Sequence, residues 1–148
     1  MIDGIGAGGG ITVTKALDGK NILLVDDDRE MLDALVTLLK DSGATLRTAA
    51  DGNVAVEVAG EFKPDLVVLD AMLPKRSGFL VLEKLKGPNK KRGAKPYVIM
   101  ITGNTGKRHQ VWAESLGVDG YLNKPFRMER LLESMEKLFS NGTTKEEP

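Results

Sequence analysis

Short apolar runs recur along the chain, and in most of them the apolar residues are consecutive rather than alternating. A strand that is apolar at successive positions is typical of a parallel sheet covered by helices on both faces. The pattern therefore predicts a sheet of buried strands. The runs are NILLV at 21–25, LVVL at 66–69, YVIMI at 97–101 and weaker ones at 44–50 and 118–122.

Between these runs the apolar residues recur at the spacing of a helix. In the segment from residue 29, Leu32, Leu35 and Leu39 share one side, and the preceding Asp28 is placed to cap its start. Alternating valines in 53–62 also fit a strand, but the helical period accounts for more of that segment. Strands alternating with helices predict one α/β domain, with a doubly wound five-stranded parallel sheet and right-handed crossovers. The remaining helices are expected over 53–62, 79–86, 104–116 and 127–139.

Glycine and polar residues at the two ends set the expected domain boundaries. Residues 1–19 are rich in glycine and weakly periodic, which predicts a flexible leader. Residues 20–140 carry the regular pattern and form the expected domain, and residues 141–148 form a polar tail.

Composition excludes several classes of protein. The 148 residues hold 21 basic and 21 acidic side chains, so no net field favours nucleic acid or an anionic membrane. Cysteine is absent, which excludes disulfides, thiolate metal sites and cysteine nucleophiles. No apolar run approaches the roughly 20 residues of a membrane-spanning helix. We therefore expect a soluble, cytoplasmic protein.

Polar side chains follow four of the predicted strands: Asp26 and Asp27, Asp70, Thr102 and Lys124. Parallel strands bring their carboxyl ends to one edge of a sheet, where ligands bind in this class of fold. Crowded carboxylates repel one another unless a cation joins them, and a shallow set of oxygen ligands suits Mg²⁺. A carboxylate nucleophile, a hydroxyl and an ammonium can hold a transferred phosphoryl group. The residues therefore predict phosphoryl transfer to Asp70.

Four segments follow one another along the chain: VDD at 25–27, LDAMLPKRSG at 69–78, ITG at 101–103 and GVDGYLNKPF at 117–126. In this order they resemble the receiver domain of two-component response regulators. The resemblance covers residues 21 to about 140 and implies a flavodoxin-like (βα)5 fold with the strand order 2-1-3-4-5. One departure is Gly103, where the family usually has alanine, although both residues are small.

The resemblance also implies roles for the acidic residues. Asp26 and Asp27 would hold Mg²⁺ together with Asp70 and the main-chain carbonyl of Met72. Asp70 would accept a phosphoryl group from a phosphohistidine on a sensor histidine kinase or a phosphotransfer protein. The chain would catalyse only its own phosphorylation and dephosphorylation, and so would not be an enzyme with turnover.

The remaining implied roles concern response to phosphate. Thr102 would bond a phosphoryl oxygen, and Lys124 would pair with the phosphate or with Asp70. Tyr121 matches an aromatic residue that changes rotamer on activation, and the bond before Pro125 is expected to be cis.

The signal would leave through a surface made by the fourth helix, the fifth strand and the fifth helix. The expected partner there is a downstream protein, with no direct contact to nucleic acid or membrane, and the chain is expected as a monomer or a phosphorylation-dependent dimer. Trp112 is expected partly exposed on this surface, with core packing against Leu116 as the alternative.

Two other functions fit parts of the sequence. The D-x-D spacing of Asp26 and Asp28 resembles haloacid-dehalogenase-type phosphatases, in which Asp26 would be the nucleophile, but Glu30 stands where that family has threonine. A receiver-shaped adaptor that never takes phosphate is disfavoured because no site position is replaced. Asp28 also leaves a one-residue doubt about the register of the acidic pair, which the end of the apolar run at Val25 decides for 26–27.

Overall fold

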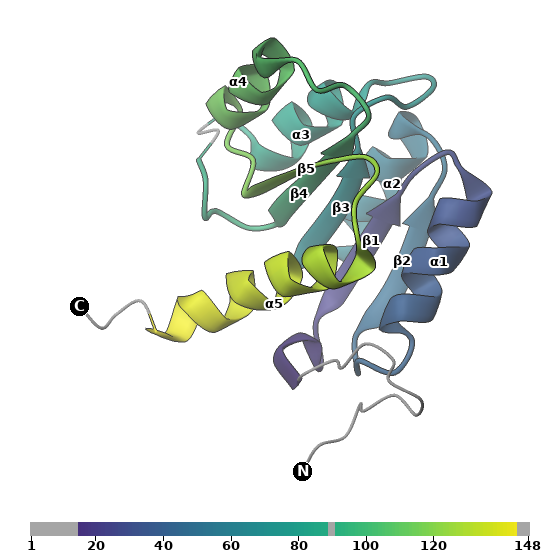
Figure 1. Ribbon diagram of the computed structural model, residues 1–148, viewed down its shortest axis with the longest axis vertical. Coiled ribbons are helices and arrows are strands. Elements are labelled where there is room, and N and C mark those ends of the chain that lie inside the picture. Colours follow the sequence, from purple (N-terminus) through teal and green to yellow (C-terminus); the bar gives the residue numbers. More distant parts are fainter. Residues whose placement is uncertain (1–14, 89–90, 145–148) are drawn as a thin grey trace.

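A five-stranded parallel sheet forms the centre of the protein (Figure 1). The computed structural model describes residues 15–88 and 91–144. The strand order is β2-β1-β3-β4-β5, and every neighbouring pair is parallel. The predicted fold class and strand order are therefore confirmed. The strands are β1 (Asn21–Val25), β2 (Thr45–Ala49), β3 (Leu66–Asp70), β4 (Tyr97–Thr102) and β5 (Gly120–Asn123).

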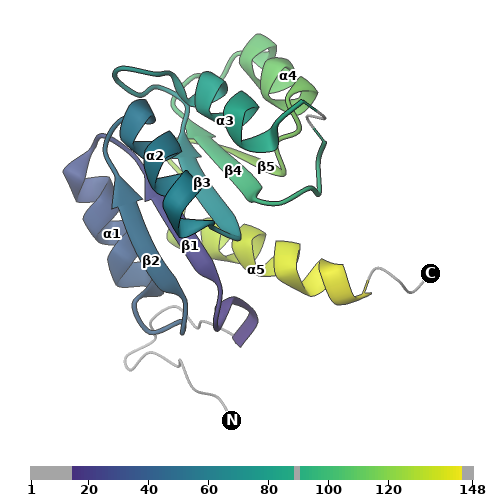
Figure 2. The ribbon, with the colours of Figure 1, turned by 180° about the vertical axis from the view of Figure 1, so that it is seen from behind.

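Helices cover both faces of this sheet (Figures 1 and 2). Helices α1 and α5 pack on one face, and α2, α3 and α4 pack on the other. Within the described residues, no helix combines the length and the apolar character needed to cross a bilayer. The helices are α1 (Arg29–Leu39), α2 (Gly52–Phe62), α3 (Gly78–Lys86), α4 (Lys107–Ser115) and α5 (Met128–Thr144), with a 3₁₀ turn, η1, at Lys15–Leu17.

Burial on both faces explains the unbroken apolar runs. In β3, Leu66 and Val68 point into the core beneath α1 and α5, whereas Val67 and Leu69 point into the core beneath α2, α3 and α4. Each central position therefore needs an apolar side chain. The edge strand β2 is mostly exposed, and this is why its sequence is mixed.

Side-chain caps place the starts of three helices. Asp28 accepts hydrogen bonds from the amides of Glu30 (3.0 Å) and Met31 (3.4 Å), which confirms it as the cap of α1. The Asp51 carboxylate caps α2 in the same way, and the Ser77 hydroxyl caps α3. The segment with alternating valines is therefore a helix, as predicted. Asp51 caps its start, and its two buried alanines, Ala55 and Ala59, lie four residues apart on one helix face.

Helix α4 begins at Lys107, later than the predicted start at residue 104. The Thr102 hydroxyl accepts the amide hydrogen of Asn104 at 3.0 Å, and the Asn104 side chain accepts that of Gly106 at 2.7 Å. These local bonds compete with helical ones and hold residues 103–106 as a loop.

Three other boundaries differ from the sequence prediction by more than one residue. Strand β5 begins at Gly120 rather than at 118, because Val118 and Asp119 still belong to its connection with α4. Helix α5 continues to Thr144, through residues expected to be tail, since extending an existing helix costs little. Leu17 is fully buried against α5, so the packed domain includes residues assigned to the leader, while residues 1–14 lie outside the described part.

A buried ion pair joins the end of α3 to the residue before β5. The side chains of Lys86 and Asp119 are 0% and 1% exposed, and Nζ lies 2.8 Å from Oδ2. Asp119 also accepts the amide hydrogens of Gly93 (2.6 Å) and Val98 (2.8 Å), and Lys86 donates to the Ala94 carbonyl. Every charge of the pair thus has partners, and the pair ties the connection after α3 to the start of β5.

Replacing Asp119 with alanine should strongly destabilise the domain. The substitution leaves the Lys86 ammonium buried without a counter-charge, so we expect the free energy of unfolding to fall by about 3–5 kcal/mol. Urea denaturation measures the loss. Lys95→Gln is the matched control, because Lys95 pairs with Asp65 at 3.7 Å while 52% exposed, and its loss should cost about 0–1 kcal/mol. Similar losses in both variants would contradict a special role for the buried pair.

Candidate functional site

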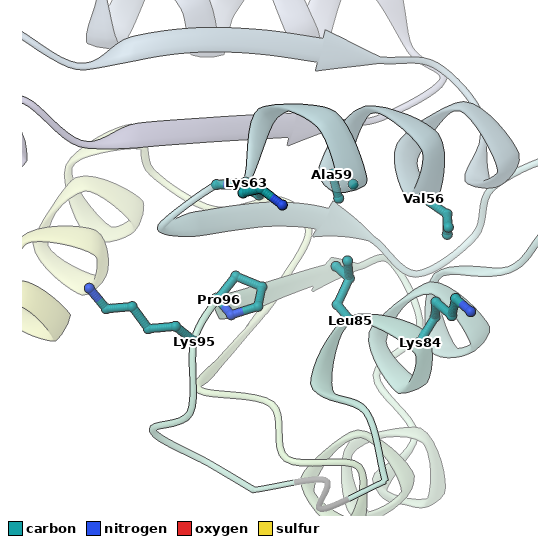
Figure 3. A pocket seen from close by; sticks show the side chains of 9 residues that line it. Val56, Ala59, Lys63, Lys84, Leu85, Lys95 and Pro96 are labelled. Atoms are coloured by element: carbon teal, nitrogen blue, oxygen red, sulfur yellow. The ribbon is translucent and has the colours of Figure 1, made fainter.

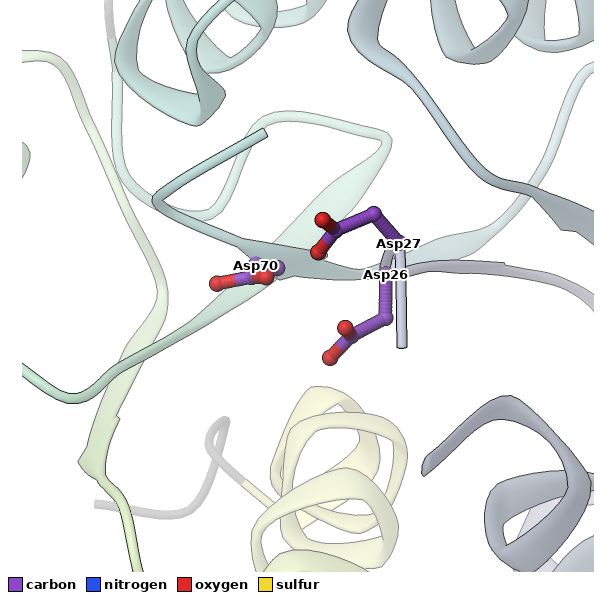
Figure 4. A group of neighbouring side chains, drawn as sticks. All are labelled: Asp26, Asp27 and Asp70. Atoms are coloured by element: carbon purple, nitrogen blue, oxygen red, sulfur yellow. The ribbon is translucent and has the colours of Figure 1, made fainter. Parts of the chain in front are cut away.

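Three carboxylates meet where β1 and β3 end (Figure 4). The two strands are neighbours in the sheet, so Asp70, the last residue of β3, lies beside Asp26 and Asp27, which follow β1. One carboxylate oxygen of each residue lies within 4.8 Å of the others. The convergence expected from parallel strand ends is therefore present.

The surroundings of Asp70 disfavour the ionised form of its carboxyl group. Its residue surface is 5% exposed, and Oδ1 accepts the amide hydrogen of Met72 at 3.2 Å. Burial raises the pKa of the Asp70 carboxyl from 3.8 to about 6, and the charges of Asp26 and Asp27 add to this. The Met72 hydrogen bond and the Lys124 ammonium act in the opposite direction.

The contacts of Asp26 and Asp28 differ, and they show which two acids of the 26–28 run face Asp70. Asp26 is 1% exposed and turns into the cluster, where Oδ1 accepts the amide hydrogen of Asp28 at 2.9 Å. Asp28 points the other way and caps α1. The acidic pair that faces Asp70 is therefore Asp26 and Asp27, of which Asp27 is exposed.

Lys124 brings one positive charge to the cluster. It directly follows β5, and its amide donates to the Thr102 carbonyl at 2.7 Å. Its Nζ lies 3.3 Å from Asp26 Oδ2 and 3.8 Å from Asp70 Oδ2. The ammonium thus stands between both buried acids, slightly nearer Asp26, and the bond before Pro125 is cis as expected.

Thr102 and Tyr121 lie on the neighbouring strands β4 and β5. Thr102 ends β4 with 1% exposure, and its hydroxyl accepts the amide hydrogen of Asn104. Tyr121 is half-buried in β5; its hydroxyl is buried and finds no hydrogen-bond partner among the described residues. Burial, then the charge of Glu114, raises the pKa of the Tyr121 hydroxyl. An unpaired buried hydroxyl costs about 1–3 kcal/mol, so this position of Tyr121 is a poor one for its polar atom.

Gly78 is a site residue that the apolar pattern did not single out. A Cβ on Gly78 would lie 2.2 Å from the Asp70 carbonyl and 2.7 Å from the Ala71 Cα. The amide of Gly78 donates to the Ala71 carbonyl at 2.9 Å, which folds the loop after Asp70 back on itself. Only glycine allows this close approach, and the SG pair before an apolar helix was the available signal.

The donor set fits a small divalent cation of the hard class. Asp26, Asp27 and Asp70 offer only carboxylate oxygens, and Asp27 is open to water. Such ligands, with water completing the shell, suit Mg²⁺. The buried acids outnumber the single ammonium of Lys124, so a cation would relieve their repulsion.

Trp112 is placed differently from the expected surface. It is 46% exposed, which confirms partial exposure, and packing in the core with Leu116 is wrong. Its ring stacks on Phe79 of α3, with centroids 4.3 Å apart and planes 3° from parallel. Trp112 therefore lies on the side of α4 that faces α3.

Asp70→Asn should stabilise the metal-free protein in a pH-dependent way. A pKa raised from 3.8 to about 6 means that Asp70 favours folding below pH 3.8 and loses that contribution as the pH rises through 6. Asparagine has no charge to bury, so we expect the variant to be more stable by about 1–2 kcal/mol near pH 7.5 and equal to wild type near pH 3.5.

Urea denaturation of both proteins in a chelator, across this pH range, measures the difference. Added Mg²⁺ should shrink the difference at neutral pH, because only wild type keeps all three carboxylates. If the difference in free energy of unfolding between the two proteins stayed constant with pH, the surroundings of Asp70 would not disfavour its ionised form.

Residues 22–136 match the family model described as response regulator receiver domain. The chain is 34% identical over 122 residues to response regulator MprA of Mycolicibacterium vanbaalenii, covering 82% of this chain and 51% of that protein. It is 35% identical over 111 residues to transcriptional regulatory protein DltR of Streptococcus agalactiae, covering 75% of this chain and 48% of that protein. The chain spans about half the length of these curated relatives.

Solved structures show the same fold. A CheY-like response regulator receiver domain protein from Methanospirillum hungatei superposes with a TM-score of 0.75 at 26% identity, covering 86% of this chain and 99% of that one. Chemotaxis response regulator CheY4 of Vibrio cholerae gives 0.72 at 26% identity, covering 81% and 98%. The resemblance seen in the sequence is confirmed: the chain belongs to the response regulator receiver domain family, which serves phosphorylation-activated signalling.

Proposed function

We propose that Asp70 accepts a phosphoryl group from a phosphohistidine of a sensor histidine kinase or phosphotransfer protein. The observation that carries this proposal is the cluster of Asp26, Asp27 and Asp70 within 4.8 Å, with Lys124 3.8 Å from Asp70. A nucleophilic carboxylate, its neighbours for a cation and a fixed ammonium are the parts that phosphoryl transfer needs. We expect the exchange in the cytoplasm.

The carboxylates of Asp26, Asp27 and Asp70 and the main-chain carbonyl of Met72 would hold Mg²⁺. When bound, this ion neutralises the acidic cluster and attracts the oxygens of the incoming phosphoryl group. Asp27 is the exposed member of the set, so it is the ligand most easily removed without disturbing the core.

In the transfer, an ionised Asp70 oxygen forms a bond to phosphorus as the bond from phosphorus to the histidine nitrogen breaks. The histidine leaves with the electron pair, and an acyl phosphate remains on Asp70. Lys124, 3.8 Å from Asp70 Oδ2, pairs with charge that develops on the phosphoryl oxygens. The Thr102 hydroxyl donates to one of these oxygens once it turns toward the site.

A cleft beside the acids offers a place for the phosphate donor. It has a volume of about 430 Å³, and Met31 of α1, Pro125, Phe126 and Met128 line it together with Lys124. An apolar surface next to the acceptor would let a helix of the donor protein dock while its phosphohistidine reaches Asp70.

The same geometry disfavours the phosphatase alternative. Asp28, the second acid of the D-x-D spacing, caps α1, and the acid that joins Asp26 in the cluster is Asp27. We therefore propose a switch that catalyses only its own phosphorylation and dephosphorylation, with a downstream protein as its target.

The proposed switch would couple a movement of the Thr102 side chain to a movement of α4. Movement of the Thr102 hydroxyl toward phosphate breaks its bond to the Asn104 amide and frees the loop 103–106. Helix α4 has no side-chain cap at Gly106, so little holds its first turn in place. Tyr121, whose hydroxyl is buried without a partner among the described residues, would then change position, and α4, β5 and α5 would present a new surface.

Incubation with acetyl phosphate and Mg²⁺ should add one phosphoryl group per chain, on Asp70. Intact-protein mass spectrometry measures the gain, and hydroxylamine should remove it because acyl phosphates are labile to this nucleophile. Asp70→Asn should take no label.

Asp27→Ala is the control for the metal. It should keep the fold and lower the phosphorylation rate by about tenfold or more at limiting Mg²⁺, the usual scale for a lost contact to a metal site. A label that persisted in Asp70→Asn, or mapped to Asp26, would reject Asp70 as the acceptor.

Phosphorylation should also change the fluorescence of Trp112. Movement of α4 relative to α3 alters the stacking of Trp112 on Phe79, so beryllofluoride with Mg²⁺ should shift its emission. Thr102→Ala should still bind the mimic but lose most of the shift, whereas Thr105→Ala, an exposed neighbour in the loop, should keep it. An unchanged shift in Thr102→Ala would show that α4 responds without this hydroxyl.

A further inference from the structure

A pocket of about 370 Å³ opens between α2 and α3, away from the acidic cluster (Figure 3). Its apolar lining comes from Val56 and Ala59 of α2, Leu85 of α3 and Pro96 before β4. Ala59 is small and nearly buried, so α2 leaves space where it faces α3. None of the residues proposed to hold metal or phosphate lines this pocket.

Exposed lysines border this apolar lining. Lys63, Lys84 and Lys95 all line the pocket, but the Lys95 side chain extends away from it (Figure 3), and its ammonium lies over the rings of Tyr97 and Phe139. Lys95 pairs with Asp65 at 3.7 Å, whereas Lys63 and Lys84 have no ion pair within the described part of the chain. An apolar surface bordered by unpaired ammonium groups complements a ligand that has an apolar body and a negative group.

The backbone at Lys63 is a second, independent observation. Lys63 ends α2 with φ 53° and ψ 64°, the left-handed conformation in which helices usually carry glycine or asparagine. A lysine there pays a steric cost that glycine would not. Figure 3 shows its side chain extending over the pocket between Ala59 and Pro96. A residue that costs more than glycine at this helix end is thus one that brings charge to the pocket.

We propose that this pocket binds a small amphiphilic anion. The apolar body lies between α2 and α3, and a carboxylate, sulfonate or phosphate at one end of it pairs with Lys63 or with Lys84, which stand at opposite ends of the lining (Figure 3). The volume falls at the low end of the roughly 300–1,000 Å³ of small-molecule sites, which favours a small ligand over a segment of a protein partner. The proposal concerns this pocket alone and does not rest on phosphorylation of Asp70.

Titration of the ¹⁵N-labelled chain with 8-anilinonaphthalene-1-sulfonate tests the proposal. We expect saturable amide shifts centred on residues 56–64, 84–85 and 95–96, with a Kd on the order of 10–100 µM, the affinity that ligand efficiency allows for a probe of this size. The uncharged analogue N-phenyl-1-naphthylamine should bind about tenfold more weakly, since it lacks the group that the lysines hold.

The double variant Lys63→Gln/Lys84→Gln should weaken sulfonate binding by about tenfold, the value of one charged hydrogen bond. The matched control Lys40→Gln/Lys137→Gln removes two exposed lysines elsewhere, one directly after α1 and one in α5, and should leave the Kd unchanged.

Lys63→Gly separates binding from folding. Glycine suits the left-handed backbone, so this variant should unfold at a higher urea concentration while binding the probe more weakly.

Three results would overturn the proposal: equal binding of the charged and uncharged probes, shifts scattered over the whole chain, or no effect of Lys63→Gln/Lys84→Gln. Displacement of the probe by an acidic amphipathic peptide, but not by a short-chain carboxylate such as decanoate, would assign the pocket to a protein partner and would also overturn it.

Discussion

The repulsion among carboxylates at the ends of two adjacent strands is the constraint on which the rest of the site depends. Strands β1 and β3 pair in parallel, so the residues that end them must lie together. Water screens this repulsion weakly, because Asp26 is 1% and Asp70 is 5% exposed. Lys124 supplies one ammonium between these two acids. The site is therefore short of positive charge, and whatever brings that charge changes the free energy of the whole cluster.

The fold can carry this cost because the sheet beneath the site is apolar on both faces. Val67 and Leu69 of β3 enter one core, and Leu66 and Val68 enter the other. Burial on this scale offsets a locally unfavourable group, which is a common arrangement at functional sites. The polar residues are confined to the strand ends, where the backbone can still turn toward solvent. The residues of the candidate site and the residues of the apolar core thus occupy different parts of the same strands.

Periodicity was enough to predict the strands and the convergence of Asp26, Asp27, Asp70 and Lys124, because it records burial and the strand ends follow from it. The strand order followed only from the resemblance to receiver domains. The sequence did not predict the late start of α4, since bonds made by the side chains of Thr102 and Asn104 there outweigh the helical period. Nor did it predict that Trp112 stacks on Phe79, because spacing along one helix does not reveal which neighbouring element it meets.

The Lys86–Asp119 pair and the acidic cluster are both buried, but they differ in how completely their charges are paired. This difference distinguishes a fixed contact from one that can respond to a new partner. Both carboxylate oxygens of Asp119 are paired, with the Lys86 ammonium and with the amides of Gly93 and Val98. A change in the position of Asp119 would therefore not improve its pairing. In the acidic cluster, Lys124 is shared between Asp26 at 3.3 Å and Asp70 at 3.8 Å, and both distances exceed the 2.8 Å of the Lys86–Asp119 pair. A fully paired group stabilises one arrangement, whereas a partly paired one leaves free energy to be released by a new partner. Incomplete pairing is therefore the property that suits the strand ends to a switch.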